Sequence, residues 1–514
     1  MDQIIQKRNR GTARSTRRAQ RQKPSHQASP YIKRRVPVYD FADEEVLQLV
    51  EHNADSLLEN VGVEFRQYPD ALALFRRAGA MVTDEMVRFP RGMCREIIQA
   101  SAPAEYTQHA RNPERSVRIG GDHCVLAPAY GPPFVSDLER GRRYATLADF
   151  ENFTRLTYMT PALHHAGGTL CEPVDVPVSQ RHLDMIYSHL RWSDKPFMGS
   201  VTEPSRAQDT IDMANIVFGE EFVQHNCVVT SLINANSPMT FDATMLGAAR
   251  VYAENGQATM ISPFILAGAM SPVTVVGTCT QVLAEALAGL AFTQLVRPGS
   301  PVVYGSFLTT MDLRSGAPTF GTPEAVLATY AMGQLSRRLG LPLRCGGHYT
   351  ASKVADAQAM MESADAMGAS IYAGANFVHQ AAGWLEGGLV TGYEKFVMDA
   401  DHLGMLIRRM GGLVVDDDSL AVEGYREAGP GTAHLGTAHT LRHFEEANYN
   451  SVLLDTNSFE QWAEDGGRDM QQRANVLWKR MLANYEPPEI DPGTDSELQA
   501  FMAERKGAED DAWY

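Results

Sequence analysis

Cysteine is scarce in this chain of 514 residues, and it is not clustered. The sequence has six cysteines and no CxxC pair: Cys94, Cys124, Cys171, Cys227, Cys279 and Cys345. Zinc ribbons and iron–sulfur clusters need cysteines at closer spacing, so both classes of site are excluded. Dispersed cysteines are typical of free thiols in a reducing compartment, and we expect a cytoplasmic protein.

Long apolar runs are also missing, although hydrophobic residues make up 44% of the chain. The apolar residues come in short runs that never approach the roughly 18 needed to cross a bilayer. The first residues lack the basic, then apolar, then small-residue pattern of a secretory signal. We therefore expect no membrane helix, no signal peptide and no membrane partner.

Positive charge is concentrated in the first residues, and the rest of the chain is acidic. Residues 1–35 contain 11 Lys or Arg and one Asp, a net charge of +10. Of the 46 basic and 62 acidic residues in total, 35 and 61 therefore lie beyond residue 35, a net charge of −26. An acidic body argues against a nucleic-acid partner. The basic arm has almost nothing to bury, so we expect it to be a disordered tail.

The sequence does contain a repeat of short apolar runs and helical patterns. Strand candidates lie at 124–128, 163–170, 196–201, 226–233, 257–262, 300–305, 341–345 and 374–379. Helical patterns lie at 146–158, 179–192, 206–218, 241–254, 276–296, 322–339, 353–369 and 393–410. About eight strand–helix units over roughly 290 residues predict a TIM (β/α)8 barrel. A doubly wound open sheet is the alternative, but no GxGxxG follows the first strand.

The predicted barrel, residues 123–412, has an extension at each end. Residues 36–122 mix helical and β-like patterns, which predicts an α+β amino-terminal region. Residues 413–514 predict an acidic linker followed by a helical tail. We expect this tail on the barrel exterior or at a subunit contact of a homo-oligomer.

Side chains that can bind a ligand gather where the predicted strands end. A TIM barrel places its active site at the carboxyl ends of its strands. The candidate substrate-binding residues are Tyr130, Phe134, Glu172, Glu203, Asn234, Tyr304, Phe307, His348, Tyr349, His379 and Gln380. Aromatic rings with two carboxylates and few basic residues suit an organic cation, and each ring can contribute up to about 2 kcal/mol. For any single aromatic residue, packing in the barrel core is the alternative.

Two other motifs predict little. His434, His439 and His443 have a metal-like spacing but no nearby cysteine or clustered acid, so we expect capping or packing and no metal site. A TIM-barrel lyase or aldolase would need a Schiff-base lysine, a metal cluster or a phosphate site. Lys353, the only lysine near these strand ends, already begins a helix, so this alternative is weak.

Several long strings resemble the trimethylamine methyltransferase family. They are SPVTVVGTCTQVLAEALAGLAFTQLVRPGSPVVYG (271–305), GGHYTASKVADAQ (346–358) and AAGWLEGGLVTGYEKFVMD (381–399). The similarity runs from about residue 40 to 485. It implies a TIM barrel that moves a methyl group from a methylated amine to the cobalt(I) of a corrinoid. It also implies that a separate small protein carries this corrinoid, so that this chain holds no cofactor tightly.

The chain departs from the family at one position. Archaeal members have pyrrolysine in or next to CGGHYT, where this chain has only standard residues. It resembles instead the non-pyrrolysine branch, whose substrates are quaternary amines such as glycine betaine. His348 or the asparagines are then expected to bind a substrate carboxylate. A trimethylamine-specific enzyme and a non-catalytic barrel that binds quaternary amines are the alternatives.

Overall fold

Seven parallel strands form the centre of the structure, a computed structural model that describes residues 29–508. In pairing order they are β10 (Phe197–Met198), β11 (Val229–Ala235), β13 (Ala258–Ala267), β14 (Val302–Gly305), β17 (Leu343–Gly346), β18 (Phe377–His379) and β7 (His123–Leu126). Every neighbouring pair is parallel. The strands are runs of mostly buried residues, as expected for a sheet that is covered on both faces.

Residues 163–170 occupy the eighth position, between β7 and β10, but they are not a regular strand. The N–H groups of His164 and Ala166 donate to the carbonyl oxygens of Leu126 and Pro196, at 2.9 and 2.8 Å. The imidazole Nδ1 of His164 also accepts a hydrogen bond from the Leu126 N–H. A side chain thus replaces a carbonyl of the sheet, which is why the regular strand expected here does not form.

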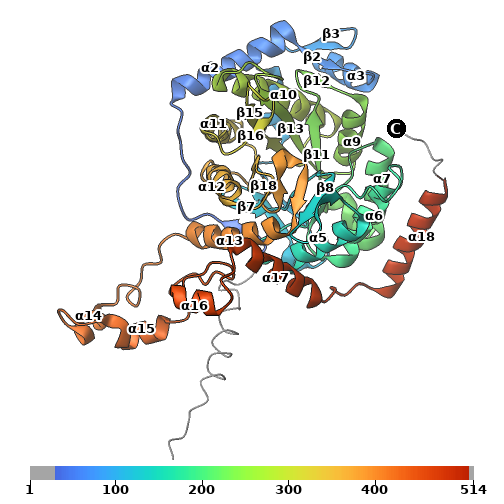
Figure 1. The fold of residues 1–514 in the computed structure, drawn as a ribbon. Helices are drawn as coiled ribbons and strands as arrows, with labels where there is room; N and C mark the ends of the chain where they lie inside the picture. The colour runs from blue at the N-terminus through green and yellow to red at the C-terminus, as the bar shows by residue number, and fades with distance from the viewer. Residues whose placement is uncertain (1–28, 509–514) are drawn as a thin grey trace, which may run out of the picture.

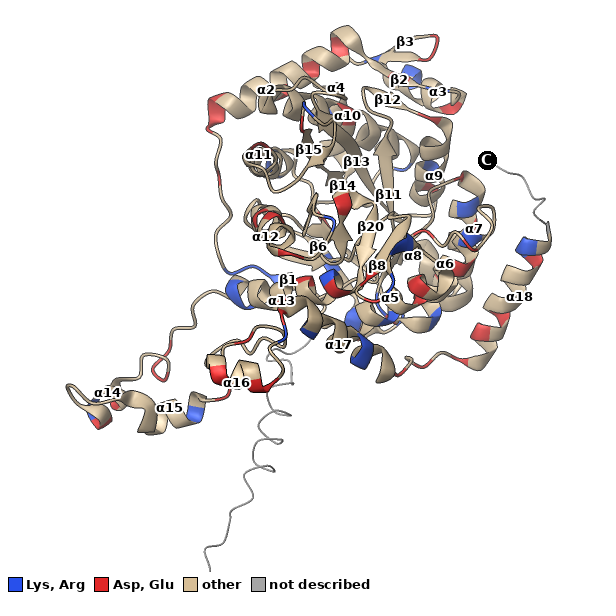
Figure 2. Ribbon diagram, in the orientation of Figure 1, with Lys and Arg blue, Asp and Glu red and all other residues tan. Residues whose placement is uncertain are grey.

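Helices follow the eight positions and surround the strands (Figure 1). They are α5 (Leu147–Met159), α6 (Arg181–Trp192), α7 (Pro204–Phe218) with α8 (Glu220–His225), α9 (Ala243–Glu254), α10 (Val275–Val296), α11 (Pro323–Leu339), α12 (Ala357–Tyr372) and α13 (Tyr393–Met410). The predicted (β/α)8 barrel is therefore confirmed. Figure 2 shows that charged residues lie mainly on the outer helices and the loops.

Helix α10 contradicts the expectation that no apolar stretch approaches the length of a membrane span. It has 22 residues and a mean hydropathy of 1.5, and 83% of its most apolar window is buried inside the fold. Its one acid, Glu285, accepts hydrogen bonds from the Ser237 hydroxyl and the Met239 N–H. The helix is apolar because it packs between the barrel and the amino-terminal helices.

The amino-terminal region contains both helices and strands. Its elements are β1 (Ile32–Lys33), α2 (Glu44–Ser56), η1 (Leu57–Val61), β2 (Val63–Phe65), α3 (Pro69–Ala78), β3 (Met81–Thr83), β4 (Met86–Arg88), α4 (Met93–Ser101), β5 (Glu105–Gln108), η2 (Pro113–Arg115) and β6 (Val117–Gly120). Strand β12 (Thr240–Phe241), which follows β11, pairs with β2. The region is thus joined to the barrel by backbone hydrogen bonds.

Gln108 of β5 ties this region to the inside of the barrel. Its amide oxygen accepts a hydrogen bond from the Thr230 hydroxyl at 2.7 Å. Its amide nitrogen donates to the carbonyl oxygens of Phe197 and Val228, at 2.8 and 3.1 Å. The side chain is fully buried, so the amino-terminal region fills the lower end of the barrel, where the strands begin. Only the end where the strands finish is left for a ligand.

The remaining elements lie over the upper end or outside the barrel. Over the upper end are β8 (Phe134–Asp137), β9 (Gly141–Tyr144), β15 (Phe307–Met311), β16 (Pro318–Thr319), β19 (Trp384–Leu385), η3 (Glu386–Gly388) and β20 (Val390–Gly392). The tail contains α14 (Val422–Ala428), η4 (His434–Gly436), α15 (Ala438–His443), α16 (Phe459–Glu464), α17 (Met470–Ala483) and α18 (Pro492–Ala508). Helix α17 packs against α13, whereas the segment with α14 and α15 projects from the body (Figure 1).

The last residues of the basic arm that was expected over residues 1–35 pack on the barrel. Residues 1–28 lie outside the described residues, but β1 pairs antiparallel with β7. Arg34 is buried, and its guanidinium donates to the carbonyl oxygens of Ala375, Gly121 and Gly374 at 2.7–3.2 Å. Residues 29–35 therefore pack on the barrel through hydrogen bonds. The sequence did not predict this packing, because the segment has no apolar periodicity.

Arg34→Ala should destabilise the protein by about 2–4 kcal/mol, because it leaves two buried carbonyl groups and one partly buried carbonyl group without a charged donor. Lys33→Ala, on the exposed side of the same strand, is the control and should change stability by less than about 0.5 kcal/mol. Urea unfolding of the three proteins measures both effects. Equal stabilities would show that residues 29–35 do not contribute to the fold.

Candidate active site

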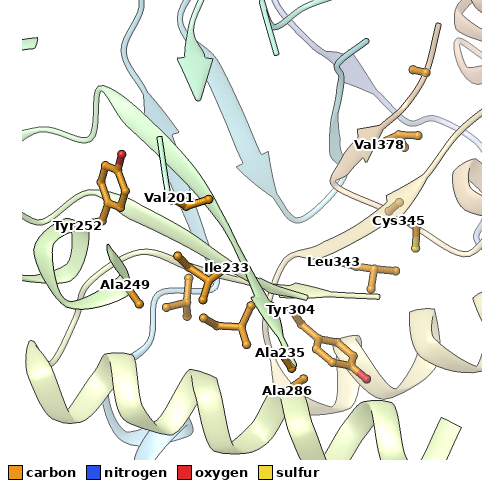
Figure 3. Close-up of a cluster of buried hydrophobic side chains, with 14 of the residues drawn as sticks. Val201, Ile233, Ala235, Ala249, Tyr252, Ala286, Tyr304, Leu343, Cys345 and Val378 are labelled. Atoms are coloured by element: carbon orange, nitrogen blue, oxygen red, sulfur yellow. The ribbon is translucent and has the colours of Figure 1, made fainter. Parts of the chain in front are cut away.

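Strand β17 carries one side chain into the barrel that is unusual for this position. Leu343 and Cys345 belong to the core between the strands and the helices, where Figure 3 shows them. Because alternate residues of a strand face opposite sides, Arg344 and Gly346 face the barrel axis. Arg344 is only 1% exposed. A permanently charged guanidinium is therefore enclosed at the end of the barrel where the strands finish.

The hydrogen-bond partners of Arg344 are all uncharged. One terminal nitrogen donates to the Gln380 amide oxygen at 2.9 Å. The other lies 3.3 Å from the Ser306 carbonyl oxygen and 3.4 Å from the Ser262 hydroxyl. The Nε atom has no partner, and no Asp or Glu of residues 29–508 forms a salt bridge with this arginine.

An aromatic cluster lies beside this guanidinium. The ring centroids of Phe307 and Tyr349 are 5.0 Å apart, and Trp384 lies 6.1 and 5.1 Å from them. Phe320 packs on the same three rings. The Arg344 guanidinium carbon lies 5.8 Å from the Phe307 ring centroid. The site thus combines one buried positive charge with rings that suit an organic cation.

Tyr349 and Gln380 link the cluster to Arg344. The Tyr349 hydroxyl donates to the same Gln380 oxygen that Arg344 binds, at 3.2 Å. The Tyr349 ring lies where a side chain at Gly346 would be, since a Cβ there would fall 1.6 Å from it. Gln380 has a φ of +52°, which turns its amide from the end of β18 toward Arg344.

His379 precedes Gln380 and is fully buried beside the ring of Tyr130, at a centroid distance of 4.8 Å. Neither of its ring nitrogens has a hydrogen-bond partner. Burial, together with the positive charge of Arg344, lowers the pKa of His379 well below its usual value. It is therefore a neutral imidazole at pH 7, able to donate one hydrogen bond and accept one.

A cavity of about 870 Å³ opens on the other side of Tyr130. It is lined by residues at the end of β10 and on helices α6, α7 and α9, and it contains both predicted carboxylates. Glu172 pairs with Arg181 at 3.1 Å, and Glu203 lies 3.7 Å from Arg206. Each carboxylate therefore already has an arginine, which weakens its attraction for a substrate cation.

Asn234 and Phe134 lie further from the cluster. Asn234 is half-buried on β11, opposite Ser262 of β13. Phe134 begins β8, where the Arg142 guanidinium carbon lies 3.5 Å from its ring centroid and Tyr144 packs against it at 4.5 Å. Arginine thus already covers one face of the Phe134 ring.

Tyr304 does not lie in the mouth of the barrel. It faces the helices, close to Ala286 and Leu343 (Figure 3), and it is fully buried. Its hydroxyl lies 3.1 Å from the Met332 sulfur in α11. As residue 304 is the third of four in β14, its outward direction follows from the alternation of the strand. The structure contradicts its candidacy for substrate binding.

His348 also faces away from the barrel axis. Its Nδ1 lies 2.5 Å from the Ala381 carbonyl oxygen, and its Nε2 lies 2.8 Å from Nδ1 of His402 in α13. Burial and the charge of Lys395 lower the pKa of His348 to about 3. A neutral imidazole whose two nitrogens are both engaged does not bind a substrate carboxylate. The structure contradicts that expectation and gives His348 a role in holding its loop.

Three residues of the site were absent from the predicted set: Arg344, Trp384 and Phe320. Arg344 could have been found from the sequence, because it stands between Leu343 and Cys345 in an apolar strand. Charged side chains are rarely buried there unless they bind a partner. Trp384 and Phe320 come from loops whose return to the barrel mouth depends on tertiary structure.

The family model described as "Trimethylamine methyltransferase (MTTB)" matches residues 8–509. The chain belongs to this family. It is 41% identical to a glycine betaine methyltransferase of Desulfitobacterium hafniense (strain Y51) over 471 residues, 91% of this chain and 98% of the other.

Two further proteins resemble the chain less closely. A proline betaine:corrinoid methyltransferase of Eubacterium limosum is 26% identical over 92% of this chain and 99% of its own. The crystal structure of the Methanosarcina barkeri monomethylamine methyltransferase has a TM-score of 0.43 at 12% identity, covering 88% of this chain and 96% of that one. Membership in the trimethylamine methyltransferase family makes the chain a methyltransferase.

Away from the mouth, three potential metal ligands lie close together. The ligand atoms of Asp418, His439 and His443 are within 4.8 Å of one another. The Asp418 carboxylate already accepts hydrogen bonds from Arg442 and His443, at 2.7 and 2.6 Å. An arginine on the same carboxylate disfavours a cation there. His434 instead packs its ring against Tyr425.

The stability of the protein should fall as the pH drops from 7 to 5, relative to the His348→Gln variant. The pKa of His348 is lowered from 6.5 to about 3, so the unfolded chain binds a proton in this range and the folded chain does not. The difference is about 2 kcal/mol at pH 5. Urea unfolding of both proteins at pH 7.5, 6 and 5 tests this. Parallel curves would mean that His348 is not held neutral.

Proposed function

We propose that this enzyme transfers a methyl group from a quaternary amine of the glycine betaine class to the cobalt(I) of a corrinoid that a partner protein carries. The aromatic cluster of Phe307, Phe320, Tyr349 and Trp384 at the barrel mouth is the observation that carries this proposal. Two relatives named for betaines support it. The reduced corrinoid supplies the nucleophile, and this chain supplies the position of the methyl group.

The chemistry of the leaving group agrees with the residues of the mouth. When a methyl group leaves R–N(CH3)3⁺, the carbon–nitrogen bond breaks and its electron pair stays on nitrogen as a neutral tertiary amine. No proton has to be delivered. When the substrate is instead a neutral tertiary amine, the group that leaves the methyl carbon is an amine anion unless the nitrogen is protonated. His379, the imidazole at the site, has a lowered pKa and is not an acid at pH 7.

Positioning is then the main contribution of the protein. Holding a methyl group in line with its attacker can supply roughly 7–11 kcal/mol in favourable cases. The rings can hold a trimethylammonium group without a negative charge beside it, which matters because the positive charge on nitrogen disappears during the reaction. The two alternatives are a non-catalytic barrel that binds quaternary amines and an enzyme specific for trimethylamine.

The mouth also offers a surface for the corrinoid protein. Val273, Leu313, Val354 and Leu389 are 47–68% exposed on loops that follow the carboxyl ends of the strands. An exposed apolar rim around an active site suits a second protein that must deliver its cofactor there. We place this encounter in the cytoplasm, because all six cysteines are buried free thiols.

We further propose that the protein is a homo-oligomer and that a second copy covers the projecting segment, residues 413–444. Nine of its residues are apolar and at least half exposed: Leu413, Val414, Val415, Leu420, Val422, Tyr425, Leu435, Leu441 and Phe444. Helices of six and seven residues are too short to be stable alone, so α14 and α15 need a permanent partner.

Replacement of Leu435, Leu441 and Phe444 by serine should therefore reduce the mass of the particle in analytical ultracentrifugation. Met81→Ser, at an exposed apolar residue outside the segment, is the control and should leave the mass unchanged. A wild-type protein that sediments as a monomer would contradict the proposed homo-oligomer.

Purified protein with a reduced corrinoid partner should methylate it with quaternary amines and not with trimethylamine. The absorbance of the methylated corrinoid measures the reaction for each member of an amine panel. Equal or better activity with trimethylamine would overturn the proposed substrate class. Betaine binding without methylation of any corrinoid partner would favour the non-catalytic barrel.

A further inference from the structure

Four buried polar atoms at the barrel mouth have no hydrogen-bond partner. They are Nε of Arg344, both ring nitrogens of His379 and Nε1 of Trp384. In the β17–β18 pairing, Gly346 lies opposite His379, and the charge of Arg344 lowers the pKa of that histidine. Phe307 touches both Arg344 and Trp384. Buried polar groups are nearly always paired, so this concentration points to a ligand that accepts hydrogen bonds.

The same place has an uncompensated charge. Arg344 is always protonated, and its three acceptors, from Gln380, Ser306 and Ser262, are neutral. A buried cation is costly unless an anion pairs with it. No carboxylate of residues 29–508 does so, which leaves the substrate as the source of the anion.

We propose that Arg344 binds a carboxylate of the substrate, so that the enzyme selects quaternary amines that also carry a carboxylate. The inference rests on the proposed function and names the group that sets its substrate class. A guanidinium matches a carboxylate with two parallel hydrogen bonds, which gives direction as well as affinity. The free Nε of Arg344 and one nitrogen of His379 supply further donors.

The proposal fixes the orientation of the substrate. The trimethylammonium group is repelled by Arg344 and attracted by the rings of Phe307, Tyr349 and Trp384. A short zwitterion therefore lies with its carboxylate toward the barrel axis and its methyl groups toward the rings and the mouth. The Tyr349 ring lies over Gly346, and its hydroxyl donates to the Gln380 oxygen that also binds Arg344.

Calorimetric titration of wild type, Arg344→Gln and Arg344→Lys with glycine betaine and with choline tests the proposal. Choline has the same trimethylammonium group and a hydroxyl in place of the carboxylate. Arg344→Gln should weaken betaine binding roughly tenfold to hundredfold, bringing its affinity to within about threefold of that for choline. Choline affinity should change less than about threefold. Arg344→Lys, which keeps the charge, should retain part of the preference for betaine.

Arg34→Gln is the matched control. Arg34 is also a buried arginine with only neutral acceptors, but it lies at the opposite end of the barrel. It should lower stability without changing the ratio of the two affinities. Melting temperatures of all variants show whether each is folded at the temperature of titration. If Arg344→Gln does not fold, Arg344→Lys still has to show a reduced betaine-to-choline ratio.

Two results would overturn the inference. One is an equal loss of affinity for betaine and choline in a folded Arg344 variant, which would give the arginine a packing role. The other is a wild type that binds choline as tightly as betaine. Failure of the proposed function is a different result: wild type would bind betaine through Arg344 but methylate no corrinoid.

Discussion

The closed ring of parallel strands gives each strand residue only two places, toward the axis or toward the helices. Inside the ring, Leu232, Met260, Val303 and Phe377 form an apolar layer. Below it, the amino-terminal region is held by Gln108. A polar side chain inside the ring can therefore meet a ligand only above this layer, at the carboxyl ends of the strands. The position of the active site follows from this packing constraint and needs no separate cause.

The number and order of the strand–helix units could be predicted because each unit has its own local pattern. A short apolar run predicts a strand buried on both faces, and a 3.6-residue period predicts the following helix. The strand predicted at residues 163–170 is not regular, because this segment bonds its neighbours through irregular backbone and the His164 side chain. The packing of residues 29–35 was not predicted, because two paired residues and one buried arginine produce no apolar periodicity.

The site was predicted by position along the chain, and this rule finds the right loops but not the direction of each side chain. Tyr304 and His348 lie at strand ends and yet face the helices, whereas Arg344 faces the axis. Counting alternate residues from Leu343 would have placed Arg344 inside the barrel. No local pattern could have shown that His348 bonds His402, since the two are 54 residues apart.

The placement of charge around the substrate also bears on the rate of methyl transfer. Two like charges about 6 Å apart repel by about 3 kcal/mol at an effective dielectric constant near 20. In the proposed orientation, Arg344 repels the substrate ammonium in the ground state. This repulsion decreases as the methyl group leaves and the charge on nitrogen disappears. The carboxylate keeps its attraction to Arg344 throughout, so that interaction contributes to binding without raising the barrier.

The aromatic rings act in the opposite sense, because their attraction for the ammonium disappears with its charge. A free carboxylate beside the nitrogen would oppose the reaction more strongly. Glu172 and Glu203 are each next to an arginine, which removes most of that effect.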